Sequence, residues 1–468
     1  MLTQDANRDS RLSFWARVRE FAVPPSIIET ATARRHVGDW AGACAAAGVD
    51  VDLSPRSVAR THGRELASRL RDDLRHLAPD LLRWHLPRIA PRGLLRPGLT
   101  VTLARYDTEG PGGVRPVHLV VRTPPAWADA GQRIGLALWD GPDSGTEARR
   151  HPHHRPNPRF RLDLHRHLWD ARRADELRAR SGADGPAAGR RDAVPFEVLE
   201  MVPPARRCAV DRWADEAGIL LRAEGRSAGT VAVRLGGRHR LLLDLVPERD
   251  GPGPPALRIA AATTATDSGA SASPVLPDAA TWVLPDLDLL RTGSIEAGRL
   301  HPLVLAALVP DHVPAAATPP ADRAGQPRFV ECRGARHRIG LVDGVLAPLD
   351  HDPAEIRREE LLVALTGTPL PCLQAIDEAH RRPDCLTGVR ERLDHGDIAG
   401  ALAVVEGLLG PGALLRSGEL RDELEAAARR RITYGLFRAG LAEGPDRLHP
   451  YHRRPGHRRA HPRNAALR

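Results

Sequence analysis

Residues 99–121 read LTVTLARYDTEGPGGVRPVHLVV, and a third apolar run, IGLALW, follows at residues 134–139. Leu99, Val101 and Leu103 alternate with smaller or polar side chains, as in a strand that has one covered face. Glycine and proline separate the apolar runs and favour turns between them. The stretch therefore predicts an antiparallel meander of three strands.

Helices are expected before this meander. The runs IIETATARR (27–35) and GDWAGACAAAG (38–48) predict two short helices, and Ser54-Pro55 provides an N-cap and a first helical residue for another. The leucines that follow recur three or four residues apart, which places them on one face of a helix. They are Leu66, Leu70, Leu74, Leu77 and Leu81. This spacing predicts one long helix that ends before Pro87.

A second region repeats the order of helix and then strand. Helices are expected at about 164–180 and 204–217. Two strands follow, TVAVRL and RHRLLLDLV, with Gly236-Gly237 as the turn of a hairpin. A third strand, LRIAA, is expected at 257–261. Helix and meander occurring twice suggest a duplicated unit, although the two copies share little residue identity.

A third meander begins the last part of the chain, with the strands RFVEC (328–332), HRIGLV and VLAPL. Asp352-Pro353 then predicts a helix N-terminus, with aspartate as the cap, proline at the first position and Glu355 at the third. Helices are expected to dominate from there to about Leu441.

The fold class that follows is α+β, with helical units, small antiparallel β meanders and a mainly helical C-terminal region. Low-complexity stretches at 261–274 and 310–327 favour linkers. We expect four parts: a helical segment plus meander at 1–140, a basic connector with helices and a second meander at 141–310, a small meander followed by helices at 328–446, and a disordered Arg/His-rich tail at 447–468.

The motif G-D-x-A-G-A occurs twice, at residues 38–43 and 396–401. Glycine and aspartate supply a turn and a helix cap, and the small residues allow close helix packing. Each copy resembles one helical hairpin of a tetratricopeptide-type repeat. Two copies far apart fall short of the three stacked repeats that a solenoid needs.

Composition excludes several classes of site. The chain of 468 residues contains no lysine, so all 68 basic residues of the Lys+Arg count are arginine, and no phosphate-binding loop or Schiff base that needs lysine is available. The five cysteines are dispersed, which argues against a disulfide framework. The N-terminus lacks the apolar core of a signal peptide, and no apolar run is long enough to span a membrane. We therefore expect a cytoplasmic protein without a membrane partner.

The net charge of +9 is concentrated in two segments. Residues 149–191 hold twelve arginines and five acidic residues, and residues 447–468 hold seven arginines and no acidic residue. Arginine can neutralise phosphates. Nucleic acid is therefore an alternative partner, with these residues as the expected contacts: Arg155, Arg159, Arg161, Arg453, Arg454, Arg458 and Arg459. A solvated, solubilising role explains the same charges equally well.

Histidines are the first candidate metal ligands, at His151, His153, His165 and His167. The surrounding arginines repel a cation and no cysteine or carboxylate completes a ligand set, so the sequence favours a solvated basic loop, and we expect no metal and no cofactor.

Three other groups of residues can be interpreted either as chemical sites or as structural features. Cys372, His380 and Cys385 have neither zinc-finger spacing nor a nucleophile motif, so buried thiols are expected. Asp350, His351 and Asp352 suggest acid–base chemistry, but a helix cap explains them. Asp286 and Asp288 suggest a metal pair, yet residues two apart point to different faces of a helix.

No catalytic motif appears in the sequence, and no catalytic residue is assigned. The leading hypothesis is a non-enzymatic accessory or scaffold protein that acts through contacts with a protein partner. The alternatives are a nucleic-acid-associated protein that uses residues 149–191 and 447–468, and an enzyme of unknown class with dispersed His, Asp and Cys residues.

Overall fold

We describe the fold from a computed structural model. The described residues are 12–110, 113–129, 132–141, 151–184, 194–203, 207–236, 239–247, 257–265, 273–313, 328–366 and 369–441. The predicted tail at 447–468 lies outside them. The chain divides into two compact units, an N-terminal unit formed mainly by residues 1–127 and 132–315 and a C-terminal unit formed mainly by residues 316–443. The first two predicted domains both lie in the N-terminal unit, although each has its own core.

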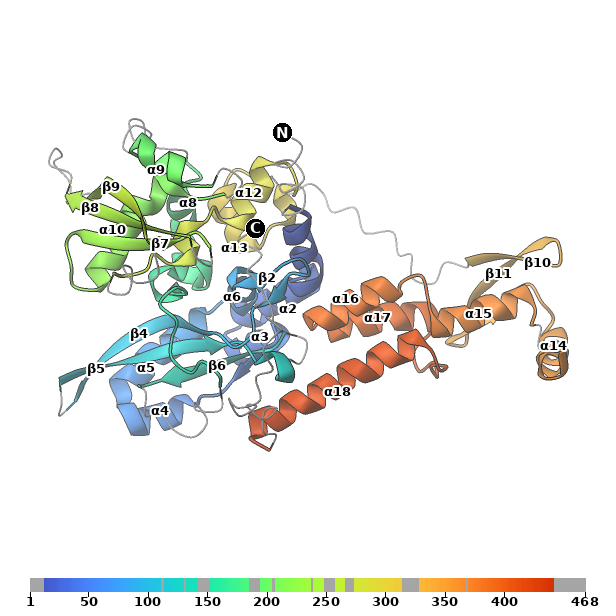
Figure 1. The fold of residues 1–468 in the computed structure, drawn as a ribbon. Coiled ribbons are helices and arrows are strands. Elements are labelled where there is room, and N and C mark those ends of the chain that lie inside the picture. The colour runs from blue at the N-terminus through green and yellow to red at the C-terminus, as the bar shows by residue number, and fades with distance from the viewer. Residues whose placement is uncertain are drawn as a thin grey trace, which may run out of the picture. The chain divides into compact units, whose positions relative to one another are not determined.

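The first core of the N-terminal unit lies between a sheet and a layer of helices (Figure 1). The predicted meander is confirmed as β4 (Thr100–Gly110), β5 (Gly113–Arg122) and β6 (Ile134–Trp139). A short strand, β1 (Val49–Val51), pairs parallel to β6 and extends the sheet. Five leucines of the predicted apolar face are buried in this core, at positions 66, 70, 74, 77 and 81.

The predicted long helix is divided into three helices, and these leucines lie on the second and third of them or, in the case of Leu77, between those two. The helices are α4 (Pro55–His62), α5 (Arg64–His76) and α6 (Pro79–His85). The first break is at Gly63, whose φ of 88° suits glycine, and the second precedes Pro79, which lacks the N–H that a continuing helix needs. Two short helices, α2 (Pro25–His36) and α3 (Trp40–Ala46), precede them as predicted.

The second core of the N-terminal unit lies between a three-stranded antiparallel sheet and a helix. The sheet consists of β7 (Gly229–Arg234), β8 (Arg240–Pro247) and β9 (Leu257–Ala265), as predicted. The helix that packs on it, α10 (Trp213–Ala223), begins later than expected. Further helices are α9 (Phe196–Met201), α11 (Asp278–Thr281), α12 (Pro285–Arg291) and α13 (Pro302–Leu308).

The helix predicted at 164–180 was wrong for most of its length. The chain forms three short 3₁₀ turns and then one helix: η3 (Leu162–Leu164), η4 (Arg166–Leu168), η5 (Ala171–Arg173) and α8 (Glu176–Ser181). Side chains of this segment form hydrogen bonds with residues outside it. Arg166 and Arg172 both donate to Asp73 on α5. These tertiary contacts override the helical preference of the local sequence.

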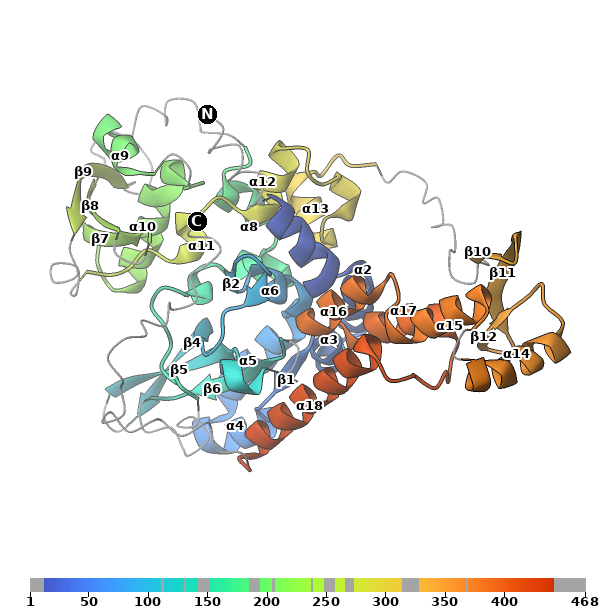
Figure 2. The same ribbon diagram turned by 45° about the vertical axis from the view of Figure 1, so that its right-hand side comes forward.

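The C-terminal unit combines a small sheet with helices (Figure 2). Its sheet is the predicted meander of β10 (Arg328–Cys332), β11 (Ala335–Val342) and β12 (Val345–Pro348). The helices are α14 (Pro353–Thr366), α15 (Pro371–Arg381), α16 (Leu386–His395), α17 (Ile398–Leu409) and α18 (Glu419–Ala439). The α+β class and the helical C-terminal region are thus confirmed.

Candidate functional site

A cavity of about 110 Å³ lies where the two cores of the N-terminal unit meet. Its walls come from residues 85–88, 159–168 and 278–285, with Phe14 and Trp15 from the first helical turns of the chain. Most of the lining is apolar, and this includes Phe160, Leu162, Leu168 and Leu284. An apolar hollow with a few polar groups, placed between two packed cores, is a common form of small-molecule site.

Arg159 and Asp278 form the charged part of the cavity wall. Arg159 Nε donates to Asp278 Oδ1 over 2.5 Å, and the backbone N–H of Asp278 donates to the Arg159 carbonyl over 3.0 Å. Arg159 is buried, and its Nη2 has no hydrogen-bond partner. Burial raises the pKa of Asp278 above its ordinary value, although Arg159 and Arg96 act in the opposite direction. The cavity wall therefore contains a guanidinium group with one nitrogen that has no hydrogen-bond partner.

Three other lining residues also have buried nitrogens without a partner. They are His85 Nε2, Arg88 Nε and Trp282 Nε1. Burial lowers the pKa of His85 to about 4, so its ring is neutral at neutral pH. Arg88 donates its other N–H groups to the carbonyls of Gly93 and Arg83, at 2.9 and 2.6 Å. Buried polar atoms normally have a partner, so their concentration around one hollow indicates that something polar belongs there.

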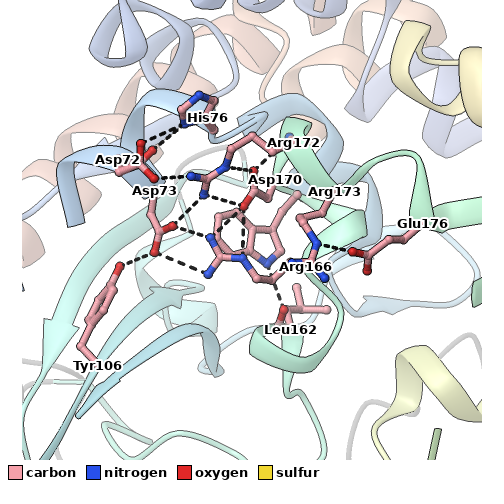
Figure 3. Close-up of polar contacts among 11 residues, drawn as sticks. Asp72, Asp73, His76, Tyr106, Leu162, Arg166, Asp170, Arg172, Arg173 and Glu176 are labelled. Atoms are coloured by element: carbon pink, nitrogen blue, oxygen red, sulfur yellow. Dashed lines mark hydrogen bonds and ion pairs between the residues drawn. The ribbon is translucent and has the colours of Figure 1, made fainter. Parts of the chain in front are cut away.

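A network of charged residues fixes the wall formed by η3 to η5 (Figure 3). Arg166 bonds to Asp73 on α5 and to Asp170, the latter at 2.7 Å, and Arg172 bonds to both carboxylates at about 3 Å. Tyr106 on β4 donates to Asp73 over 2.7 Å. Burial opposes ionisation of Asp170, but the hydrogen bonds from Arg172 and Arg166 hold its pKa below the usual range. The network ties the segment that carries Leu162 and Leu168 to α5 and the sheet.

A second, smaller cavity of about 20 Å³ shares Leu168, Trp282 and Leu284 with the first. Arg180 makes two bonds of 2.6 Å to Glu216, and His165 Nε2 lies 3.1 Å from the same carboxylate. Burial opposes ionisation of Glu216, yet its contacts with His165 and Arg180 hold its pKa below the usual range. The Glu216 carboxylate is thus paired with side chains of the protein itself.

The structure separates the four histidines that were candidate metal ligands. His165 and His167 lie beside each other in the small cavity, with ring centroids 5.8 Å apart, whereas His151 Nε2 lies 2.8 Å from the Thr123 carbonyl. Among the described residues these histidines form no group of three ligand atoms. The expectation of a solvated loop was wrong for three of them, because His151, His165 and His167 are buried and only His153 is exposed.

The arginines expected to contact nucleic acid lie in different environments. Arg155 is exposed, Arg159 binds Asp278, and Arg161 binds Asp163 and Glu224 at 2.8 and 2.7 Å. The other four, Arg453, Arg454, Arg458 and Arg459, lie outside the described residues. Binding to nucleic acid stays a prediction.

Acidic residues singled out in the sequence have structural partners. Asp352 accepts from the backbone N–H of Ala354 over 2.7 Å, which confirms the predicted cap, and Asp350 binds Arg338. Asp286 is buried and accepts from Arg19 and from Trp84, while Asp288 pairs with Arg207.

The cysteines partly follow the prediction. Cys372 is buried as predicted and Cys385 is half-buried. Cys372 lies close to Cys332 and His351 rather than to His380 or Cys385. The sequence did not indicate this association.

No sequence pattern connects the polar residues of the large cavity, because they come from separate segments that share no motif. His85 ends α6 and Arg88 follows it, whereas Asp278 begins α11 and Trp282 follows that helix, near a low-complexity stretch. No spacing joins them in the sequence.

Comparison with protein families, curated proteins and solved structures finds no match for this chain. No helix in the described part of the chain is long and apolar enough to cross a membrane.

Proposed function

We propose that this chain is a non-enzymatic accessory protein whose N-terminal unit binds a small carboxylate with an apolar body. The observation that carries the proposal is the set of four buried nitrogens without partners, on His85, Arg88, Arg159 and Trp282, around an apolar cavity of about 110 Å³. A ligand with a hydrogen-bond acceptor would pair with these donors, and its apolar body would fill the remaining volume.

Charge favours a carboxylate over a neutral acceptor. Asp278 is the one acidic residue in the lining, and it faces Arg159 while Arg96 and Arg234 lie near enough to influence it. Arg88 adds a buried positive charge, and it donates hydrogen bonds to the neutral carbonyls of Gly93 and Arg83. Positive charge therefore exceeds negative charge around the cavity, and hydrogen bonds between ionised groups are about twice as strong as neutral ones.

Size limits the ligand. A protein cavity of roughly 150 Å³ accepts benzene, so a hollow of about 110 Å³ suits a carboxylate no larger than benzene, such as a short alkyl carboxylate. The described residues that line the cavity include no serine, threonine or cysteine. This lining supports binding rather than covalent catalysis.

Thermal denaturation with a panel of ligands tests the proposal. Propionate and butyrate should raise the melting temperature of the N-terminal unit more than propionamide and butyramide do. Leu284→Trp, which places a larger side chain in the wall, and Arg159→Met, which removes the donor, should abolish this shift. Arg155→Met removes an exposed arginine of the same segment and should leave it intact. Equal shifts for carboxylates and amides, or shifts that survive Leu284→Trp, would contradict the proposal.

A protein partner is the second candidate function, and helix α18 favours it. Ile432 and Leu436 lie one turn apart on this helix and are 64% and 42% exposed. A pair of large apolar side chains on one helix face is a common element of a protein interface. Sedimentation of the wild type and of Ile432→Glu over a range of concentrations tests the simplest partner, a second copy. Self-association that the variant lacks would support it, and a wild type that stays monomeric would exclude it.

A further inference from the structure

Three potential metal ligands meet in the C-terminal unit. Cys332 is the last residue of β10, His351 follows β12, and Cys372 lies in the first turn of α15. Their ligand atoms all lie within 4.8 Å of one another. Both cysteines are free thiols and buried, and the His351 side chain is 4% exposed. The three elements thus bring two sulfurs and an imidazole to one buried point.

The environment of His351 leaves one ring nitrogen available. Its Nδ1 faces Glu355 Oε2 at 3.5 Å, and its Nε2 is buried without a hydrogen-bond partner. The ring of His337 stacks on it, with centroids 4.2 Å apart and planes 17° apart, which restrains its orientation. Histidines that bind metals usually direct their second nitrogen to a carboxylate, which fixes the tautomer. Glu355 and His337 therefore hold His351 in the arrangement that a ligand histidine needs.

We propose that Cys332, His351 and Cys372 bind one zinc ion. Two thiolates and one imidazole are a donor set that Zn²⁺ prefers over Mg²⁺ or Ca²⁺, which take oxygen ligands. Zinc–sulfur bonds of about 2.3 Å at tetrahedral angles place two sulfurs about 3.8 Å apart. Separations within 4.8 Å therefore need to close by at most about 1 Å. Binding forms two zinc–sulfur bonds and one zinc–nitrogen bond as water ligands leave the ion, and it releases two thiol protons to solvent. One water stays in the fourth position, and no oxidation state changes.

The zinc ion has a structural role in this arrangement. It joins the end of β10 and the segment after β12 to the start of α15, three places that are far apart in the sequence. A metal that binds only the folded state adds to the stability of the unit. The site lies outside the cavity of the N-terminal unit, so the two proposals stand independently.

A disulfide between Cys332 and Cys372 is the main alternative. It would use both sulfurs but leave His351 Nε2 buried and unpaired. Zinc satisfies all three groups at once, which is the reason to favour it.

Metal analysis of the full-length protein tests the site. We expect one zinc per chain after dialysis, lost from Cys332→Ser, Cys372→Ser and His351→Asn. Cys385→Ser, which changes a half-buried cysteine outside the group, should retain it. Zinc content that is negligible in the wild type, or that falls equally in Cys385→Ser, would overturn the proposal.

Replacement of zinc by Co²⁺ keeps the test decisive if the serine variants fail to fold. The wild type stripped of metal should bind one Co²⁺ and develop intense thiolate-to-cobalt charge-transfer absorption, which zinc then removes. Bound Co²⁺ without this absorption would overturn the proposal. So would an intact mass of freshly purified protein that reveals a disulfide between Cys332 and Cys372.

Discussion

His151 is buried and makes two hydrogen bonds of opposite sense. Its Nε2 donates to the Thr123 carbonyl over 2.8 Å, and its Nδ1 accepts from the backbone N–H of His153 over 3.3 Å. A proton on Nδ1 would face that N–H group instead of accepting from it. Burial lowers the pKa of His151 to about 4 from an ordinary 6.5, although the hydrogen bond to Thr123 acts in the opposite direction.

The pH dependence of stability follows from this shift. Below about pH 6.5, His151 binds a proton in the unfolded chain but not in the folded chain. Stability therefore falls as the pH decreases towards about 4. Between about pH 6.5 and about pH 5, His151 lowers the free energy of unfolding by roughly 2 kcal/mol. Urea unfolding at the two pH values measures it. His151→Gln should lose about 2 kcal/mol less than the wild type, whereas His154→Gln in the same loop should behave like the wild type. Parallel losses in all three proteins would contradict this account of His151.

Asp170 and Asp72 both bind Arg172 but differ in burial. The side chain of Asp170 is 0% exposed and also accepts the N–H of Arg172, while that of Asp72 is 52% exposed. Loss of one partner from a buried charge network leaves the others unsatisfied, whereas water replaces an exposed partner. We expect Asp170→Asn to lower the free energy of unfolding by about 3 kcal/mol and Asp72→Asn by less than about 0.5 kcal/mol. Chemical denaturation measures both changes, and similar values for the two variants would refute the assigned role of burial.

At the scale of elements, the repeated G-D-x-A-G-A motif forms the same local structure twice. Asp39 accepts the N–H of Gly42 over 2.8 Å at the start of α3, and Asp397 accepts that of Gly400 over 2.9 Å at the start of α17. A Cβ on either second glycine would lie 2.1 Å from the capping carboxylate, so the motif requires glycine there. An arginine five residues before each aspartate binds its other oxygen. The motif is thus a capped helical turn.

The two caps should differ in strength. The side chain of Asp397 is 5% exposed and that of Asp39 is 37% exposed. Loss of an N-cap lowers stability by about 0.5–2 kcal/mol, and the buried cap belongs at the upper end because water cannot replace it. Calorimetry should therefore reveal a larger loss for Asp397→Ala than for Asp39→Ala, with no loss for Glu406→Ala on the exposed face of α17. The reverse order would count against burial as the cause.

Several elements could be predicted because their signals are local. Short apolar runs bounded by turn residues placed all three meanders, and proline with an aspartate cap placed the start of α14. The helix expected at 164–180 failed for the opposite reason, since its arginines bind carboxylates distant in the sequence. The cavity and the zinc ligands could not be found in the sequence, because only the tertiary fold brings His85 to Asp278 or Cys332 to Cys372.

At the scale of the whole molecule, the chain consists of two units with separate cores. We expect calorimetry to resolve two unfolding transitions. Leu103→Ala removes a buried side chain from the N-terminal unit and Leu393→Ala does so in the C-terminal unit. Each should destabilise one transition by about 3 kcal/mol and leave the other in place. A single transition that both variants shift would mean that the units unfold together.

The central claim is that the cavity of the N-terminal unit binds a small apolar carboxylate. Isothermal titration of the full-length protein with butyrate and with butyramide tests it most directly. The account predicts one saturable site that binds the carboxylate at least about tenfold more tightly than the amide, and no binding to Leu284→Trp. Equal affinity for both ligands, no detectable binding, or unchanged binding to Leu284→Trp would contradict it.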